Sequence, residues 1–217
     1  SNLVSLDLKF KYLLYEVDGV YYSKTLYLRG IDFEALVQNM TNLRELQLAF
    51  VNISSSVPQS LVNLSSLTSL SLFDCSLHGQ FPTNIFLMPK LQTIDLSFND
   101  LLTVFLPEFH SGSSLEKLHL SFTSFSGKLP SSIANLESLI ELDLSYTTFS
   151  GEIPNAIGNL KSLNILDLEE CNLSGEVPLA IWNLTRLSSL SLRKQFSRSS
   201  SASSTWFRCI ATVMISI

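Results

Sequence analysis

The sequence has little of what marks small secreted domains, nucleic-acid binders and membrane spans. It contains three cysteines among 217 residues, too few for a disulfide framework. Charged residues make up 15% of the chain and the net charge is −5. No basic patch with interleaved aromatic residues is present, which argues against a nucleic-acid binder. No stretch of about 20 apolar residues could form a complete membrane span.

Catalytic and metal-binding motifs are also missing. The sequence has neither HExxH nor CxxC, and Gly127-Lys128 lacks the other residues of a phosphate-binding loop. The histidines have no metal-ligand spacing to a cysteine or a carboxylate. We therefore expect no enzymatic activity and no cofactor. His119 falls on a predicted strand opposite the acidic residues Glu116 and Glu141, where we expect a solvated polar side chain.

What the sequence does contain is a repeat of 24 residues. The pattern LxxLxL begins at seven positions that are each 24 residues apart: Leu43, Leu67, Leu91, Leu115, Leu139, Leu163 and Leu187. A further apolar column follows in each unit, at Ile53, Leu77, Leu101, Phe125, Phe149 and Leu173. A fixed short period is typical of a chain that stacks units into a solenoid.

The spacing within a unit predicts its shape. Two leucines in LxL point to the same side of a short strand. One such strand cannot bury its leucines alone, but strands stacked in parallel about 4.8 Å apart share a continuous core. Gly-x-apolar-Pro then bends the chain away from the sheet, and the apolar spacing of the return predicts a 3₁₀-like turn on the convex side. We expect the leucine, isoleucine and phenylalanine columns to be buried.

The pattern varies along the chain. Residues 43–192 hold the regular repeats, whereas 1–42 are irregular, with Leu6/Leu8 and Leu26/Leu28 predicting about two earlier strands. Ser55 and Thr103 replace the motif glycine, and the proline of one repeat is displaced to Pro107.

Residues 193–217 are Ser-rich and do not repeat, so we expect a poorly ordered tail; an atypical hydrophobic cap is the alternative. The chain starts inside a repeat without a signal peptide, and we expect a fragment or a truncated or misjoined gene product.

The repeat resembles the plant extracellular type of leucine-rich repeat, with the pattern LxxLxLxxNxLxGxIPxxLxxLxx matched by residues 43–192. The segment NLRELQLAFVNISSSVPQSLVNLSSLTSLSLFDCSLHGQFPTNIF resembles the ectodomains of plant receptor-like proteins. This resemblance implies a horseshoe with a parallel sheet on its concave face. It also implies a receptor at the extracellular face of the plasma membrane, which recognises a protein or peptide and signals in defence or development through a co-receptor kinase. Polygalacturonase-inhibiting proteins use the same unit, so a soluble inhibitor of cell-wall-degrading enzymes and a non-functional gene product remain alternatives.

The cysteines predict no disulfide. Cys75 and Cys171 occupy the same position four repeats apart, which places them about 19 Å apart, beyond the roughly 7 Å limit of a disulfide. We expect buried free thiols.

Five asparagines satisfy N-x-[ST], a mild excess over the roughly three expected by chance. They are Asn39, Asn52, Asn63, Asn172 and Asn183. Asn63 and Asn183 hold equivalent positions on the predicted convex side, where a glycan would leave the sheet clear. The alternative is that the NL[ST] triplet is only repeat consensus.

Aromatic residues form a column just after the predicted strands. The candidate partner-binding residues are Phe50, Phe73, Phe98, Phe122 and Tyr146, together with the acidic residues Glu141, Asp143, Asp167, Glu169 and Glu170. Clustered exposed aromatics favour an interaction site, and the carboxylates favour a basic partner. The alternative is that the rings stack as a ladder that stiffens the sheet.

Overall fold

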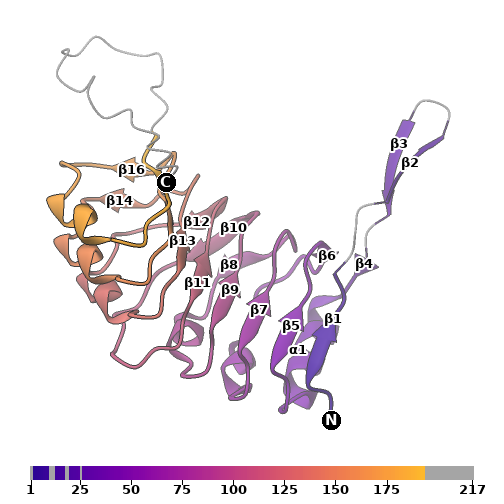
Figure 1. The fold of residues 1–217 in the computed structure, drawn as a ribbon. Coiled ribbons are helices and arrows are strands. Elements are labelled where there is room, and N and C mark those ends of the chain that lie inside the picture. Colours follow the sequence, from indigo (N-terminus) through magenta and orange to yellow (C-terminus); the bar gives the residue numbers. More distant parts are fainter. Residues whose placement is uncertain (1, 10–12, 18–19, 25, 194–217) are drawn as a thin grey trace.

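The structure is a computed structural model that describes residues 2–9, 13–17, 20–24 and 26–193. An eight-stranded parallel sheet lines one side of a curved solenoid (Figure 1). Its strands follow one another in the order β1 (Ser5–Asp7), β5 (Glu45–Gln47), β7 (Ser69–Ser71), β9 (Thr93–Asp95), β11 (Lys117–His119), β13 (Glu141–Asp143), β15 (Ile165–Asp167) and β17 (Ser189–Ser191). The predicted parallel sheet is confirmed.

Neighbouring strands of this sheet pair in the register that the repeat dictates. Leu46 lies opposite Leu70 and Leu70 lies opposite Ile94. The pairing continues past each strand end, where the Leu48 N–H donates to the Ser71 carbonyl at 2.9 Å. Equivalent side chains therefore stand in straight columns across the solenoid.

Smaller sheets form where the chain has turned away from the eight-stranded sheet. A three-stranded sheet joins β8 (His78–Gln80), β10 (Asn99–Val104) and β12 (Thr123–Phe125), and pairs join β14 (Ser150–Gly151) to β16 (Asn172–Leu173) and β4 (Leu26–Tyr27) to β6 (Val51–Asn52). A β-hairpin of β2 (Leu13–Val17) and β3 (Val20–Lys24) extends away from the solenoid (Figure 1).

Short 3₁₀ helices make the return on the convex side, as the sequence predicted. They are η1 (Gln59–Asn63), η2 (Thr83–Leu87), η3 (Ser131–Asn135), η4 (Asn155–Asn159) and η5 (Leu179–Asn183). Each is preceded by the motif proline, whose backbone is extended with φ between −68° and −66°. The ring holds φ near this value, and the residue after proline can therefore begin a tight helix at a fixed point.

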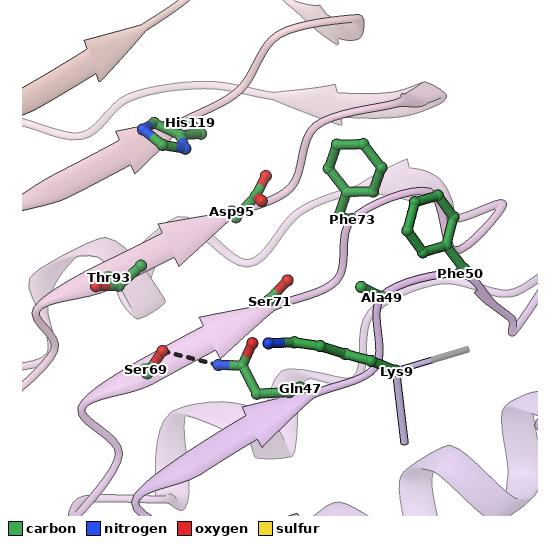
Figure 2. Close-up of a pocket in the computed structure, with 10 residues that line it drawn as sticks. All are labelled: Lys9, Gln47, Ala49, Phe50, Ser69, Ser71, Phe73, Thr93, Asp95 and His119. Carbon is green, nitrogen blue, oxygen red and sulfur yellow. Dashed lines mark hydrogen bonds between the residues drawn. The ribbon is translucent and has the colours of Figure 1, made fainter. Parts of the chain in front are cut away.

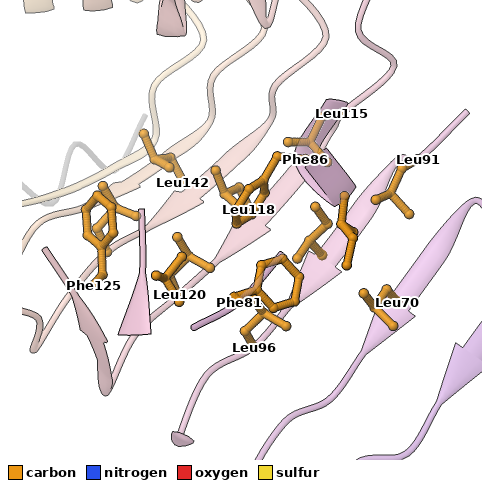
Figure 3. Close-up of a cluster of buried hydrophobic side chains, with 14 of the residues drawn as sticks. Leu70, Phe81, Phe86, Leu91, Leu96, Leu115, Leu118, Leu120, Phe125 and Leu142 are labelled. Atoms are coloured by element: carbon orange, nitrogen blue, oxygen red, sulfur yellow. The ribbon is translucent and has the colours of Figure 1, made fainter. Parts of the chain in front are cut away.

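The predicted apolar columns form one continuous core (Figure 3). Leu118, Leu120 and Phe125 have no exposed surface. The leucines at the C-terminal end of the described solenoid are only partly buried, because they pack against a described repeat on one side only. They are Leu173, Leu187, Leu190 and Leu192.

Leu101 contradicts the expected burial of its column, since it is 67% exposed. Strand β10 contains a bulge. Asn99 pairs with Thr123 and Val104 pairs with Phe125, so between these two pairs β10 has three more residues than β12. Val104 thereby takes the buried place that Leu101 was expected to fill. The extra strand length uses up the return, and no 3₁₀ helix follows Pro107 in this fully described repeat.

Both strands predicted before Leu43 form, but the second does not start a repeat. β1 contains Leu6 and pairs with β5, but Leu26 pairs with Val51 in a separate sheet. The segment at Leu26 therefore corresponds to the end of a repeat rather than to its start. The β2–β3 hairpin is an insertion within this one long repeat, and α1 (Gly30–Asn39) replaces its 3₁₀ helix.

A polar column runs inside the solenoid behind the strands. Asn99 has only 1% of its surface exposed, and its amide nitrogen donates to the carbonyls of Leu72 and Leu96, both at 2.8 Å. Its amide oxygen accepts from the backbone N–H groups of Cys75 and Leu77. One side chain thus satisfies the backbone of two repeats.

The prediction of buried free thiols is confirmed. The Cys75 thiol donates to the Leu48 carbonyl at 3.0 Å, and the Cys171 thiol donates to the Leu144 carbonyl at 3.1 Å. Burial raises the pKa of Cys75 to about 12 and that of Cys171 to about 11, so both thiols stay protonated at neutral pH.

The predicted Ser-rich tail falls outside the described residues apart from Arg193. Among the described helices, none has the length and apolar character needed to cross a bilayer.

Replacement of Asn99 tests the polar column. Asn99→Ala leaves two buried N–H groups and two buried carbonyls without this partner, and each such group costs about 1–3 kcal/mol. We expect unfolding free energy in urea to fall by about 3 kcal/mol or more. Thr123→Val is the matched control, because Thr123 makes one such bond, to the Leu120 carbonyl, and valine already occupies this column at Val51; its expected loss is about 1 kcal/mol. Equal losses for the two variants would contradict this account.

Candidate ligand-binding face

Five aromatic rings lie side by side where the strands of the eight-stranded sheet end. We call them the ring ladder: Phe50, Phe73, Phe98, Phe122 and Tyr146. Phe98 and Phe122 stack with centroids 4.5 Å apart, and Phe122 and Tyr146 stack at 4.4 Å with an angle of 9° between planes. Phe73 contacts the rings on either side of it at 5.0 Å. The ladder predicted as an alternative does form, yet three of its rings remain exposed, 46% for Phe98, 38% for Phe122 and 40% for Tyr146, while Phe50 and Phe73 are half-buried.

The backbone of the column that holds four of these rings is in the left-handed region. The φ angle is 64° at Phe50, 52° at Phe122 and 56° at Glu170. This conformation costs a non-glycine residue roughly 1–2 kcal/mol. It is held by pairing between repeats, since the Phe122 N–H donates to the Ser145 carbonyl at 3.2 Å. The sharp turn out of each strand fixes where the rings point.

Aspartates at the last strand position support this turn. One carboxylate oxygen of Asp143 accepts from the Ser145 N–H at 2.9 Å, and Asp167 accepts from the Glu169 N–H at 2.9 Å. Asp95 binds the Ser97 N–H in the same way. These are side-chain turns of the kind that aspartate favours. Asp143 and Asp167, both predicted as partner-binding residues, therefore also have a structural role.

Glu141 joins two basic side chains on the concave face. Its carboxylate binds the Lys117 ammonium at 2.6 Å and the His119 ring at 3.0 Å. Partial burial acts to raise the pKa of Glu141, but the hydrogen bonds and charges of Lys117 and His119 outweigh burial, so the pKa is lowered. His119 contacts Glu141 as expected, but in the sheet it lies opposite Asp95 and Asp143, and its side chain is 28% exposed rather than solvated. Among the described residues, Glu141 is the one predicted acidic residue with a basic partner in an ion pair.

The other predicted acidic residues gather beside the end of the ring ladder. Glu169 accepts a hydrogen bond from the Tyr146 hydroxyl at 3.3 Å and another from Ser191. Burial raises the pKa of Asp167, and the charges of Asp143 and Glu169 raise it further. One buried carboxylate oxygen of Glu170 has no hydrogen-bond partner within the described part of the chain.

A shallow hollow of about 400 Å³ lies at the other end of the concave face (Figure 2). Its floor consists of the short hydroxyl side chains Ser69, Ser71 and Thr93 on β7 and β9. Figure 2 shows the Lys9 side chain reaching across it beside Gln47, with Phe50 and Phe73 at one end. Among the described residues, no three acidic, histidine or cysteine side chains are placed to hold a metal ion.

Sequence reasoning missed Lys9 and the left-handed column. Lys9 directly follows the first LxL, at Leu6 and Leu8, so its place at the sheet could have been found by aligning that strand with the others. The short side chains at Ser69 and Ser71 were an available signal for a hollow. Nothing in residue type predicts positive φ at a phenylalanine.

The five sequon asparagines lie in different surroundings. Asn63 and Asn183 are exposed, each the last residue of a 3₁₀ helix on the convex side. Asn172 is exposed in β16, whereas Asn52 is half-buried and accepts a hydrogen bond from Ser54. The Asn39 amide donates to the Ala35 carbonyl. Glycosylation at these positions stays a prediction.

Comparison with protein families agrees with this geometry. Models described as leucine-rich repeat match residues 113–173 and 90–111. The chain is a leucine-rich repeat solenoid. It is 41% identical to Receptor-like protein 6 of Arabidopsis thaliana over 115 residues, which cover 53% of this chain and 11% of that protein. It is 46% identical to Receptor-like protein Cf-9 of Solanum pimpinellifolium over 87 residues, 39% of this chain and 10% of that one. The aligned part of the chain thus covers about a tenth of each of these relatives.

Solved plant receptors share the fold. The plant peptide hormone receptor RGFR1, in complex with RGF2, superposes with a TM-score of 0.70 at 34% identity over 78% of this chain and 27% of the receptor. The Arabidopsis receptor kinase HAESA, in complex with the peptide hormone IDA and the co-receptor SERK1, gives 0.69 at 26% identity over 88% of this chain and 33% of HAESA. The leucine-rich repeat solenoid is therefore similar to receptor ectodomains.

The ring ladder should contribute to stability. Phe122 stacks on both neighbours, and each aromatic pair contributes about 0.5–1.5 kcal/mol, so Phe122→Ala should lower unfolding free energy by about 1–3 kcal/mol. Phe122→Gly should cost about 1 kcal/mol less than Phe122→Ala, because glycine accepts the left-handed backbone. Trp182→Ala, at a ring that is 69% exposed, is the control and should change stability by less than about 0.5 kcal/mol. A greater loss for glycine than for alanine would contradict the strain argument.

The lowered pKa of Glu141 predicts how its contribution depends on pH. The folded protein holds the ionised form more tightly than the unfolded chain does, so this stability is present above the ordinary pKa of 4.5 and is lost as pH falls through the lowered value. Glu141→Gln should therefore cost about 0.5–1 kcal/mol at pH 7 and progressively less below pH 4.5. The control Glu137→Gln changes an exposed carboxylate and should show no such trend in urea unfolding series. A difference for Glu141→Gln that persists unchanged at the lowest pH would exclude this role.

Proposed function

We propose that this leucine-rich repeat solenoid is a ligand-recognition part of a plant cell-surface receptor-like protein, acting through a co-receptor kinase in defence or development. The ligand would be an extracellular protein or peptide, and the chain would have no catalytic role of its own. The parent protein would lie at the extracellular face of the plasma membrane.

The observation that carries the proposal is the concave face itself. The core is made by the inward-facing columns, so the outward-facing side chains of β5 to β15 do not contribute to it. The edge where the strands end carries the ring ladder and half-buried carboxylates, and the hollow lies at one end of the face. Exposed aromatic clusters of this kind mark interaction surfaces, and rigid rings make good anchors. The likeness to receptors solved with peptide hormones supports the same reading.

Selection of peptides on the purified chain tests the proposal. Random dodecapeptides displayed on phage would be selected against the wild-type chain, and the enriched peptides synthesised and measured for affinity. Ser69→Trp fills the concave hollow with a large ring. Ser131→Trp places the same ring on the convex side, at an exposed position in η3. We expect Ser69→Trp to weaken binding at least tenfold, about 1.4 kcal/mol, and Ser131→Trp to leave it unchanged.

Two measurements keep this test sharp. Circular dichroism and urea unfolding confirm that both tryptophan variants are folded, so lost binding is not lost structure. Enriched peptides that bind the two variants equally well would place recognition elsewhere and refute a concave-face ligand site.

A further inference from the structure

The two halves of the concave face differ in charge. At the hollow, the ammonium of Lys9 has no ion pair among the described residues. The hydroxyls of Ser71 on β7 and Thr93 on β9 line the same hollow as possible hydrogen-bond donors (Figure 2). Two carboxylates also stand at this end, Asp7 on β1 and Asp95 on the far wall, and each has one oxygen held by a backbone N–H, from Lys9 and from Ser97 respectively. This end therefore offers a cation and several donors to an acidic group.

The other half carries more carboxylates than cations, and Arg193, whose carbonyl accepts the Glu170 N–H at 2.7 Å, is a described cation beside them. Asp143 and Asp167 lie directly opposite each other on β13 and β15, and Glu169 follows them at the end of the ring ladder. Lys117 on β11 is already bound to Glu141. A buried oxygen of Glu170 has no hydrogen-bond partner among the described residues, and a donor from outside would satisfy it. A basic group is the complement of this half.

The spacing between the two ends sets a length. Ser71 pairs with Asp95, Asp95 with His119, His119 with Asp143, and Asp143 with Asp167, each one strand further on. Three to four steps of about 4.8 Å span about 14–19 Å, which an extended chain covers with four to six residues at about 3.3 Å each. The ring ladder runs along the same span as an apolar edge.

We propose that this concave face binds an extended peptide that crosses the strands, with an acidic side chain in the hollow at Lys9. A basic side chain four to six residues away then lies over Asp143 and Asp167. The proposal rests on the proposed function and adds the polarity and spacing of the ligand. Opposite charges at the two ends also fix the direction in which the peptide lies, because the reversed placement puts like charges together.

Short synthetic peptides of defined charge are the probe. Fluorescently labelled, blocked peptides of glycine and serine would carry one aspartate and one arginine five positions apart, in both chain directions. Matched peptides replace aspartate with asparagine, arginine with glutamine, or aspartate with a second arginine. A further peptide places the two charges two positions apart. Binding to the full chain is followed by fluorescence anisotropy at low salt, where exposed charge pairs are least screened.

The expected result is that one direction of the five-spaced peptide binds best. Neutralising either charge, or shortening the spacing, should weaken its binding by about threefold or more, as expected for one exposed ion pair. Lys9→Glu should make the asparagine peptide bind better than the aspartate peptide. The double variant Asp143→Asn, Asp167→Asn should abolish the advantage of arginine over glutamine, and asparagine can still accept the Ser145 and Glu169 N–H bonds.

Several outcomes overturn the polarity. They are tightest binding by the peptide with two arginines, an unchanged aspartate preference in Lys9→Glu, and no binding of either bipolar peptide at about 1 mM. These outcomes are distinct from failure of the proposed function. If phage-selected peptides still lose affinity on Ser69→Trp, the concave face binds ligand but without this charge pattern.

Discussion

The fold depends on one constraint: a single three-residue strand is too small to bury its own inward leucine. That leucine is buried only when neighbouring repeats pack on both sides of it. Leu118 has no exposed surface because β9 and β13 flank β11 on both sides. Leu190, with a described neighbour on one side only, is half-buried. Everything else in the repeat serves this stacking, including the proline that starts each return and the polar side chain of Asn99 that binds two repeats together.

Strict stacking also creates the proposed binding face. Because each strand contributes its core leucine from the inward column, the outward columns can vary without disturbing the core. The turn after each strand imposes positive φ on whatever residue stands there, from Phe50 to Glu170, and lateral backbone bonds stabilise that conformation. The rings of Phe122 and Tyr146 are consequently held by the scaffold before any ligand arrives, which reduces the entropy that binding must overcome.

Much of this architecture was predictable from the period of 24 residues, and the exceptions have physical reasons. The expected burial of the apolar column failed at Leu101 because a three-residue bulge shifts the pairing of β10 with β12. Such a bulge cannot be recognised from a hydrophobic pattern. Leu26 was mistaken for the start of a repeat because an LxL pair looks alike in a sheet strand and after an inserted hairpin. Stacking of the ring ladder was foreseen as an alternative to binding, but the structure shows that Phe98, Phe122 and Tyr146 are both stacked and exposed.

For the charged side chains of the concave face, the sequence gives their positions and the structure gives their partners. The acidic side chains of β13 and β15 stand out in the sequence, but only the structure shows what they bind. Glu141 is paired with Lys117, and Asp143 and Asp167 each use one oxygen to hold the turn after their strand. The structure also places Lys9 in a hollow lined by hydroxyl side chains. A rigid solenoid keeps such groups at fixed multiples of the strand spacing. The identity and the separation of a few outward side chains can therefore determine which ligand such a face selects, while the leucines behind them stay the same.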